Sequence, residues 1–122
     1  MKPKYNFFKN TSYALNGLKS MLSESSFKIE LLIILPLLIC SIFLPVSMES
    51  HLLLVIVLVI VLIAECVNTG IEVCVDLITQ DFHPLAKVAK DVGSAAVMLS
   101  ILNAAAVWIF AIFSLLVDTR LS

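Results

Sequence analysis

The sequence predicts an all-α membrane protein with an N-terminal amphipathic surface helix and three transmembrane helices. Hydrophobic residues make up 61% of the 122 residues and charged residues 14%, whereas soluble domains average about 45–50% and about 25%. One small core cannot hide this apolar excess from water. Aromatic residues at 8% and only three glycines argue against a membrane β-barrel, which needs alternating strands and many turns. The composition therefore disfavours a soluble enzyme and a nucleic-acid-binding protein.

The first element, expected at about residues 5–23, has the pattern of an amphipathic helix. Lysines and Asn16 fall on one side of this segment, and apolar residues recur at helical spacing on the other side, namely Ala14, Leu15, Leu18, Met21 and Leu22. Such a helix lies in the interface between lipid and water. Alternatively, the same helix forms one wall of a cytoplasmic active site, with a lysine that reaches a phosphate.

Three long apolar runs follow, and each predicts a transmembrane helix. About 20 residues are needed to cross about 30 Å of hydrocarbon. The run that starts at Gly93 reaches this length without a charge, but the run from Leu52 to Ala64 does not and has to continue through Glu65. A carboxylate is therefore expected at membrane depth. The spans are expected at about residues 28–47, 51–71 and 92–117 within a single domain of residues 1–122.

The distribution of lysines predicts how the spans are oriented. The segment before the first span contains Lys2, Lys4, Lys9, Lys19 and Lys28. The connection between the first two spans has no Lys or Arg, whereas Lys87 and Lys90 precede the third span. Positive residues are enriched on the cytoplasmic side of membrane proteins. The N-terminus and the second connection are therefore expected in the cytoplasm, and the first connection and the C-terminus outside.

A polar stripe follows the second apolar run. On a helix that turns about 100° per residue, Glu65, Asn68, Glu72 and Asp76 share one narrow face. A carboxylate at the bilayer centre costs about 2.5–3.5 kcal/mol, and neighbouring carboxylates repel one another. The stripe therefore needs a cation, a lysine partner or a retained proton. The alternative is a helix end that emerges into water, which would explain Asp76 better than Glu65.

The segment after the stripe supplies cations. Pro84 is suited to the first turn of a helix, where its missing N–H costs nothing, and Lys87, Lys90 and Asp91 follow on the next turns. A lysine at a membrane boundary either extends its ammonium group to the lipid headgroups or holds a phosphate. The facing carboxylates favour the phosphate interpretation for Lys90. His83, in the preceding connection, is more typical of a surface residue than of a ligand.

Glu24 and Glu30 flank Lys28 at the start of the first span. The simpler interpretation is a charged helix start, where acidic residues are favoured. Alternatively, Glu24 pairs with Glu72 to hold Mg²⁺, which one or two carboxylates typically bind together with substrate phosphates. The sequence has neither a P-loop nor a glycine-rich phosphate cradle. Any nucleotide would therefore be held by lysine and by carboxylate-bound metal.

Two long motifs resemble those of the bacterial integral-membrane diacylglycerol kinases. They read Glu65-x-x-Asn68-Thr69-x-Ile71-Glu72-x-x-Val75-Asp76 and His83-Pro84-Leu85-Ala86-Lys87-x-Ala89-Lys90-Asp91-x-Gly93-Ser94-Ala95-Ala96, and the resemblance covers the chain from Tyr13 onward. It implies a homotrimer in the bacterial inner membrane with active sites shared between subunits. It also implies Mg²⁺-dependent phosphorylation of diacylglycerol by ATP, giving phosphatidic acid, with no nucleic-acid partner.

The resemblance also implies roles for individual residues. Glu65 corresponds to the catalytic base beside the lipid hydroxyl, and Glu24 and Glu72 correspond to the metal ligands. The expected substrate-binding and ATP-binding residues are Glu24, Asn68, Asp76, His83, Lys90 and Asp91.

Three alternatives remain open at this point. Asp76-Leu77 and the segment from His83 to Lys87 are similar to undecaprenol kinases, a sister group with a different lipid substrate. A small proton-coupled transporter would use Glu65 as its intramembrane carboxylate. A non-catalytic membrane adaptor would use the stripe as an assembly interface, although this leaves Lys90 opposite the carboxylates unexplained.

Overall fold

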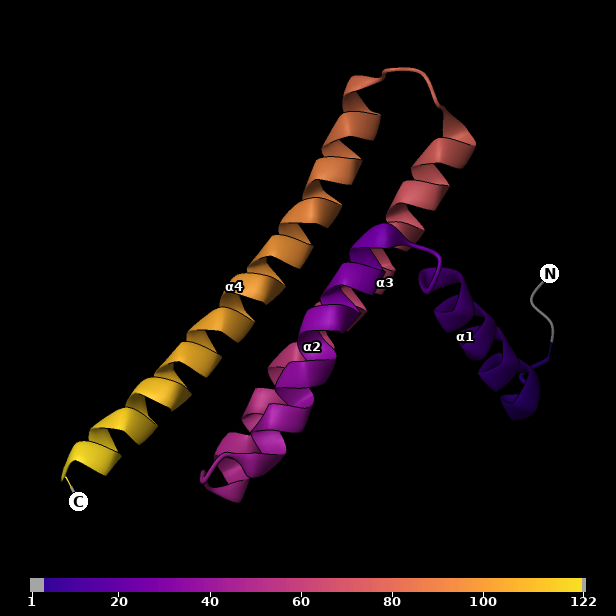
Figure 1. The fold of residues 1–122 in the computed structure, drawn as a ribbon. Helices are drawn as coiled ribbons and strands as arrows, with labels where there is room; N and C mark the ends of the chain where they lie inside the picture. Colours follow the sequence, from indigo (N-terminus) through magenta and orange to yellow (C-terminus); the bar gives the residue numbers. More distant parts are fainter. Residues whose placement is uncertain (1–3, 122) are drawn as a thin grey trace.

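The computed structural model describes residues 4–121, which form four helices and no strand. In Figure 1, the long helices run side by side, and the short N-terminal helix α1 (Phe7–Met21) projects away from them. The helices α2 (Ser25–Phe43), α3 (Met48–Ile78) and α4 (Pro84–Leu121) are each long and apolar enough to cross a membrane. The all-α fold with three apolar spans, predicted from the sequence, is therefore confirmed.

The short helix α1 spans Phe7–Met21. The side chain of Asn6 accepts a hydrogen bond from the backbone N–H of Lys9 and caps the first turn. Leu15 and Leu18 are exposed to the surroundings, whereas Met21 is buried at the junction with the next helix. The apolar side of α1 therefore remains available to contact the membrane surface, as the sequence pattern predicts for residues 5–23.

The first long helix, α2, spans Ser25–Phe43. The helix ends earlier than the expected span of about 28–47, because Pro45 disfavours helical backbone at the residue before it. Leu44 is accordingly extended. Pro36 lies inside α2 without ending it.

The two remaining helices extend well beyond the expected spans. α3 covers Met48–Ile78, with the Ser47 hydroxyl accepting a hydrogen bond from the N–H of Ser50 at its start. α4 covers Pro84–Leu121 and begins at the proline, as predicted. The whole polar stripe from Glu65 to Asp76 therefore lies on one continuous helix, and part of it continues past the apolar span.

α3 lies at the centre of the packing and contacts both α2 and α4. The core along these contacts consists of Ile34, Leu54, Val57, Leu58, Val61, Ala104 and Trp108. The indole N–H of Trp108 donates a hydrogen bond to the backbone carbonyl of Leu54 over 3.2 Å, which satisfies the polar atom of a buried tryptophan. This bond links α3 and α4 at one level along their antiparallel axes.

Candidate active site

The polar stripe continues the buried face of α3. Leu54, Leu58 and Val61 of this face are in the core, and the next two inward positions are Glu65 and Asn68. Their exposed fractions are 6% and 7%. Glu65 is therefore a buried carboxyl group and not a residue at a helix end that emerges into water.

A second carboxyl group meets Glu65 from α2. The side chain of Glu30 interacts directly with that of Glu65, and its Oε2 atom is buried without a hydrogen-bond partner. Glu30 follows Phe27 by three residues and precedes Ile34 by four, and both of these are buried. The simpler interpretation of the sequence, a charged helix start, does not account for this position of Glu30. Its spacing from apolar neighbours at i−3 and i+4 was the signal that could have placed it on the inward face.

Asn68 joins the stripe to α4. Its Nδ2 atom donates a hydrogen bond to Oε1 of Glu72 over 3.3 Å. Its Oδ1 atom is buried without a hydrogen-bond partner and lies against the backbone of α4 at Gly93, where a Cβ atom would be 2.3 Å away. The backbone of α4 therefore passes directly beside the stripe at Gly93.

Lys90 is the cation that the structure brings to the stripe. Its Nζ atom lies 2.7 Å from Oδ1 of Asp76, and the two side chains are 42% and 50% exposed. Asp91, in contrast, forms an ion pair with Lys87 of its own helix. The prediction that Lys90 faces the carboxylates therefore agrees with the geometry, whereas Asp91 is engaged one turn back along α4.

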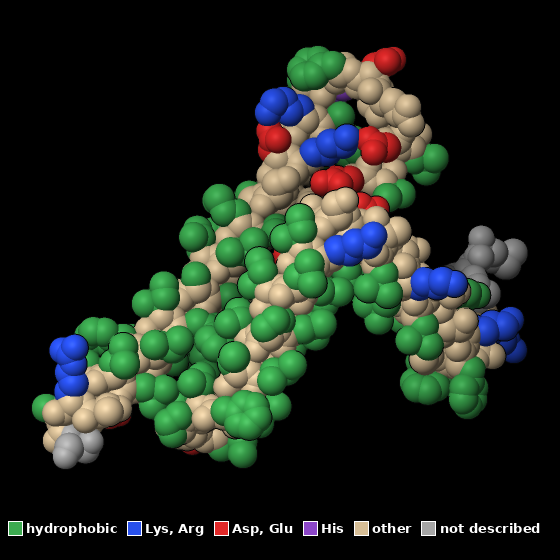
Figure 2. Space-filling view, viewed as in Figure 1, with side chains coloured by type: hydrophobic (Ala, Val, Ile, Leu, Met, Phe, Trp, Pro, Cys, Tyr) green, Lys and Arg blue, Asp and Glu red, His purple; other side chains and the backbone are tan. Residues whose placement is uncertain are grey.

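A cavity of about 480 Å³ lies between the end of α3 and the start of α4, and its lining includes His83, Lys87, Lys90 and Asp91. His83 is exposed, and its Nδ1 atom accepts a hydrogen bond from the N–H of Leu85 over 3.1 Å. The ring therefore caps the start of α4 while it borders the cavity. Figure 2 shows Lys, Asp and Glu side chains gathered at this end of the molecule.

The expected metal ligands lie on two helices. Glu24 is exposed at the start of α2 and makes no capping hydrogen bond with its side chain, and Glu72 is half-buried on α3 beside Asn68. Among residues 4–121, no group of three His, Cys, Asp or Glu side chains is arranged so that it could hold a metal ion without further ligands. Two carboxylates completed by substrate phosphates are nevertheless a typical magnesium donor set, so these residues fit Mg²⁺ that arrives with a nucleotide.

An apolar groove of about 580 Å³ runs between α2 and α4 over α3. Glu30 is the charged residue among those that line it, and the others include Ile34 of α2, Val61 of α3 and Phe113 of α4. Since Glu30 contacts Glu65, the groove has the carboxyl pair at one end.

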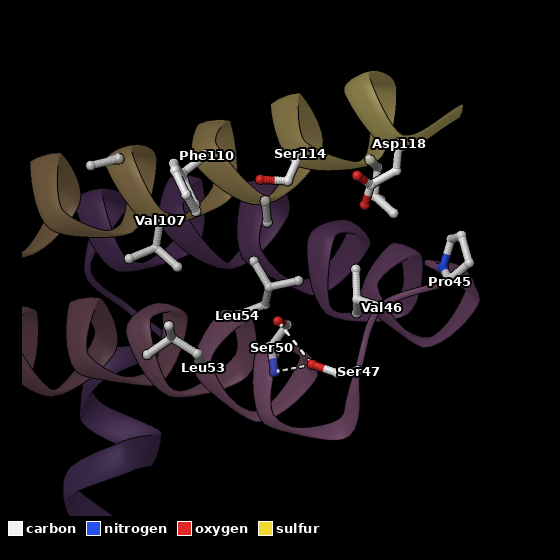
Figure 3. A pocket seen from close by; sticks show the side chains of 13 residues that line it. Pro45, Val46, Ser47, Ser50, Leu53, Leu54, Val107, Phe110, Ser114 and Asp118 are labelled. Atoms are coloured by element: carbon white, nitrogen blue, oxygen red, sulfur yellow. Dashed lines mark hydrogen bonds between the residues drawn. The ribbon is translucent and has the colours of Figure 1, made fainter. Parts of the chain in front are cut away.

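Another cavity, of about 540 Å³, lies at the opposite end of the molecule, and Figure 3 shows its lining. Asp118 is the charged residue in this lining, and Ser47 and Ser50 are engaged in the cap of α3. This cavity has no cation or second carboxylate in its lining, so the chemistry is concentrated at the other end.

The fold and the site together define a helical membrane protein in which a groove for an apolar chain leads to buried carboxyl groups. A cavity lined by Lys87 and Lys90 lies at the end of α3, beyond these carboxyl groups. This arrangement is suited to an enzyme that brings a membrane lipid together with a polar, anionic co-substrate.

Comparisons with known proteins identify the family. The family profile described as prokaryotic diacylglycerol kinase matches residues 12–112. The chain is 33% identical over 107 residues to the diacylglycerol kinase of Escherichia coli K12, covering 87% of this chain and 88% of that protein. It is 34% identical over 99 residues to that of Pseudomonas aeruginosa, covering 80% of each chain. The relative from Helicobacter pylori is 31% identical over 102 residues, covering 83% of this chain and 80% of that protein.

The chain belongs to the prokaryotic diacylglycerol kinase family. The resemblance predicted from the two motifs is confirmed. The family match and the names of the relatives support diacylglycerol kinase activity, and with it the class of ATP-dependent kinases.

Proposed function

We propose that this chain phosphorylates diacylglycerol at the end of the apolar groove where Glu30 meets Glu65, with ATP bound on the side of Lys90. The observation that carries the proposal is the burial of Glu65 beside Glu30, which lines the apolar groove. The cavity that Lys87 and Lys90 line is further along α3. A lipid alcohol approaching from the bilayer and a nucleotide approaching from water would meet at this residue.

Glu65 is the proposed general base. In the transfer step, the O–H bond of the lipid alcohol breaks and its proton passes to a carboxylate oxygen of Glu65. The alcohol oxygen forms a bond to the γ-phosphorus as the bond between that phosphorus and ADP breaks. A positioned base contributes about 10²–10⁴-fold to such a reaction. Most of the remaining catalysis comes from charge stabilisation and alignment of the phosphates.

The interaction between Glu30 and Glu65 indicates that these two residues lie at one level along α2 and α3, and this supports a metal site at Glu24 and Glu72. The two helices are antiparallel, and each rises about 1.5 Å per residue. Glu24 therefore lies about 9 Å above the carboxyl pair along α2, and Glu72 about 10 Å above it along α3. Glu24 and Glu72 would hold Mg²⁺ here, and the ion would supply positive charge to the phosphates of ATP.

The remaining polar residues support the nucleotide. Gly93 lies against Asn68, so Lys90, three residues earlier on the antiparallel helix α4, is level with Glu72 and can turn from Asp76 to a phosphate. Asn68 orients Glu72 through its amide. His83 and Asp91 border the cavity between α3 and α4 and would contact the rest of the nucleotide.

We also propose the expected assembly and orientation: a homotrimer with shared sites in the bacterial inner membrane, with the N-terminus in the cytoplasm and the C-terminus outside. The distribution of lysines supports the orientation. The outer face of α3, opposite the stripe, is apolar and exposed in one chain at Ile56, Ile63 and Val67, which leaves it available for neighbouring subunits.

A phosphate-transfer assay tests the proposed function. Purified protein in mixed micelles receives labelled ATP and Mg²⁺ with diacylglycerol, undecaprenol or a short soluble alcohol, and Glu65→Gln serves as the matched inactive variant. Label is expected in phosphatidic acid. The absence of a labelled lipid would contradict kinase activity, and labelling of undecaprenol in place of diacylglycerol would reassign the substrate.

A further inference from the structure

The carboxyl groups of Glu30 and Glu65 form a pair, but the proposed mechanism gives a chemical role only to Glu65. Glu65 is buried, with 6% of its surface exposed. Glu30 is half-buried, and its Oε2 atom is inaccessible and without a hydrogen-bond partner. One carboxyl group comes from α2 and the other from α3, so neither helix alone explains their contact.

Few groups near the pair can offset two negative charges. On α3, the Glu65 carboxyl and the Cys66 thiol interact electrostatically with Glu30. Lys28, on the same helix as Glu30, is exposed. The nearby lysines of α4 are engaged elsewhere, because Lys90 pairs with Asp76 and Lys87 with Asp91. Two carboxyl groups in contact within a weakly polar environment cannot both remain ionised, and they exchange protons as one unit.

We propose that Glu30 is a positioning residue for phosphoryl transfer: it holds one proton that it shares with Glu65 and thereby orients the ionised oxygen of Glu65 toward the lipid hydroxyl. The inference deepens the proposed function and rests on it. The shared proton satisfies the otherwise unpartnered Oε2 atom of Glu30 by making it a donor to Glu65. The pair then carries one negative charge in place of two.

The proton balance of the reaction follows from this arrangement. Before transfer, Glu30 is protonated and Glu65 is ionised. The proton released by the lipid hydroxyl forms an O–H bond with the free oxygen of Glu65, so that the pair becomes neutral while the new P–O bond forms. One proton leaves the pair for solvent after the products depart, and the starting state returns. Glu30 does not touch the reacting atoms in this scheme.

Replacing Glu30 in two ways distinguishes this role from simple packing. In Glu30→Gln, the amide N–H donates to Glu65 as the carboxylic acid would, so turnover at neutral pH is expected within about threefold of the wild type. In Glu30→Leu, the donor is lost, and turnover is expected to fall by about 10- to 100-fold, the scale of one hydrogen bond to a charged group. The exposed Glu49, in the first turn of α3, provides matched Gln and Leu controls that should change neither value.

The pH profile is the first readout that a packing role would not change. Wild-type turnover should fall in alkaline solution when the pair loses its shared proton, because the doubly charged pair repels the phosphates and no longer orients Glu65. The amide of Glu30→Gln cannot lose its hydrogen in this range, so its alkaline fall should disappear. An unchanged alkaline fall in Glu30→Gln, or equal losses of turnover in Glu30→Gln and Glu30→Leu, would overturn the inference.

A spectroscopic readout separates this inference from the proposed function, because it needs no turnover. In a detergent without ester groups, the wild type at neutral pH should show the infrared carbonyl band of a protonated carboxylic acid. The band should be lost in Glu30→Gln and retained in Glu49→Gln. A wild type without this band would refute the shared proton even if the lipid is phosphorylated. A band that behaves as expected in a protein that phosphorylates no lipid would refute the proposed function and leave the shared proton in place.

Discussion

A Cβ atom at position 93 would lie 2.3 Å from Oδ1 of Asn68, so α4 can approach the stripe this closely because residue 93 has no side chain. The Nδ2 atom of the same Asn68 side chain donates a hydrogen bond to Oε1 of Glu72. Helix packing and a proposed metal ligand are therefore linked through a single side chain.

Gly93→Ala tests this link. The added methyl group has to displace the buried amide of Asn68, and overpacking of this kind costs about 1–3 kcal/mol. We expect lower unfolding stability in mixed micelles and weaker Mg·ATP binding, because Glu72 loses its oriented donor. Gly17→Ala, in α1, is the matched control, since a Cβ there meets nothing within 4 Å. Alanine in a helix should stabilise the control by about 0.5–1 kcal/mol, so equal effects of the two substitutions would contradict the close approach at Gly93.

Glu65→Gln should mainly lower turnover, whereas Glu72→Gln should mainly weaken Mg·ATP binding. The first keeps the size of the side chain but removes its basicity, so turnover should fall about 10²–10⁴-fold with little change in Mg·ATP affinity. Its stability should hold or rise, because a buried carboxyl group has been removed. Glu72→Gln should instead weaken Mg·ATP binding. Turnover and nucleotide affinity are measured for both variants in one lipid mixture, and near-normal turnover of folded Glu65→Gln would return that residue to a structural role.

Lys90 and Asp76 should have opposite effects on nucleotide binding. Lys90→Gln removes the proposed phosphate contact and should raise the KM for ATP, whereas Asp76→Asn removes a competing partner and should lower it. Stability should change by less than about 1 kcal/mol in either variant, because exposed ion pairs contribute little. Arg120→Gln, in the last turn of α4, controls for the loss of one positive charge. A KM for ATP that is unaffected by Lys90→Gln would contradict the assigned role.

The proposed orientation is tested by cysteine accessibility. Cys40, Cys66 and Cys74 are free thiols and are first replaced by alanine. A reagent that cannot cross the membrane should then label Glu49→Cys from outside and Gln80→Cys from the cytoplasmic side, since both positions are exposed. The reverse pattern would invert the topology.

Mixed oligomers test the proposed sharing of sites between subunits. Chains carrying Glu65→Gln are combined with chains carrying Lys90→Gln before assembly is completed, and turnover is compared with each variant alone. A site that takes α3 from one subunit and α4 from another should recover activity, because some sites contain both intact residues. If activity stays at the level of the single variants, each chain contains its own complete site, as the contact between Lys90 and Asp76 within one chain would allow.

Local patterns in the sequence were sufficient to predict the class of fold and the polar stripe. The thickness of a bilayer requires long apolar runs, and the three that the sequence contains became α2, α3 and α4. The fixed turn of a helix places Glu65 and Asn68 on one face whatever surrounds them, and both are indeed buried. The motifs around these residues were also sufficient to indicate the family.

The contacts between helices were decided by the tertiary structure. Periodicity specifies which residues share a face, but the rotation and register of one helix against another depend on how all the side chains pack. The pairing of Glu30 with Glu65, the approach of Gly93 to Asn68 and the bond from Lys90 to Asp76 depend on that rotation and register. For this reason the sequence alone predicted a row of carboxylates in need of partners, and only the packed helices determined which partner each one has.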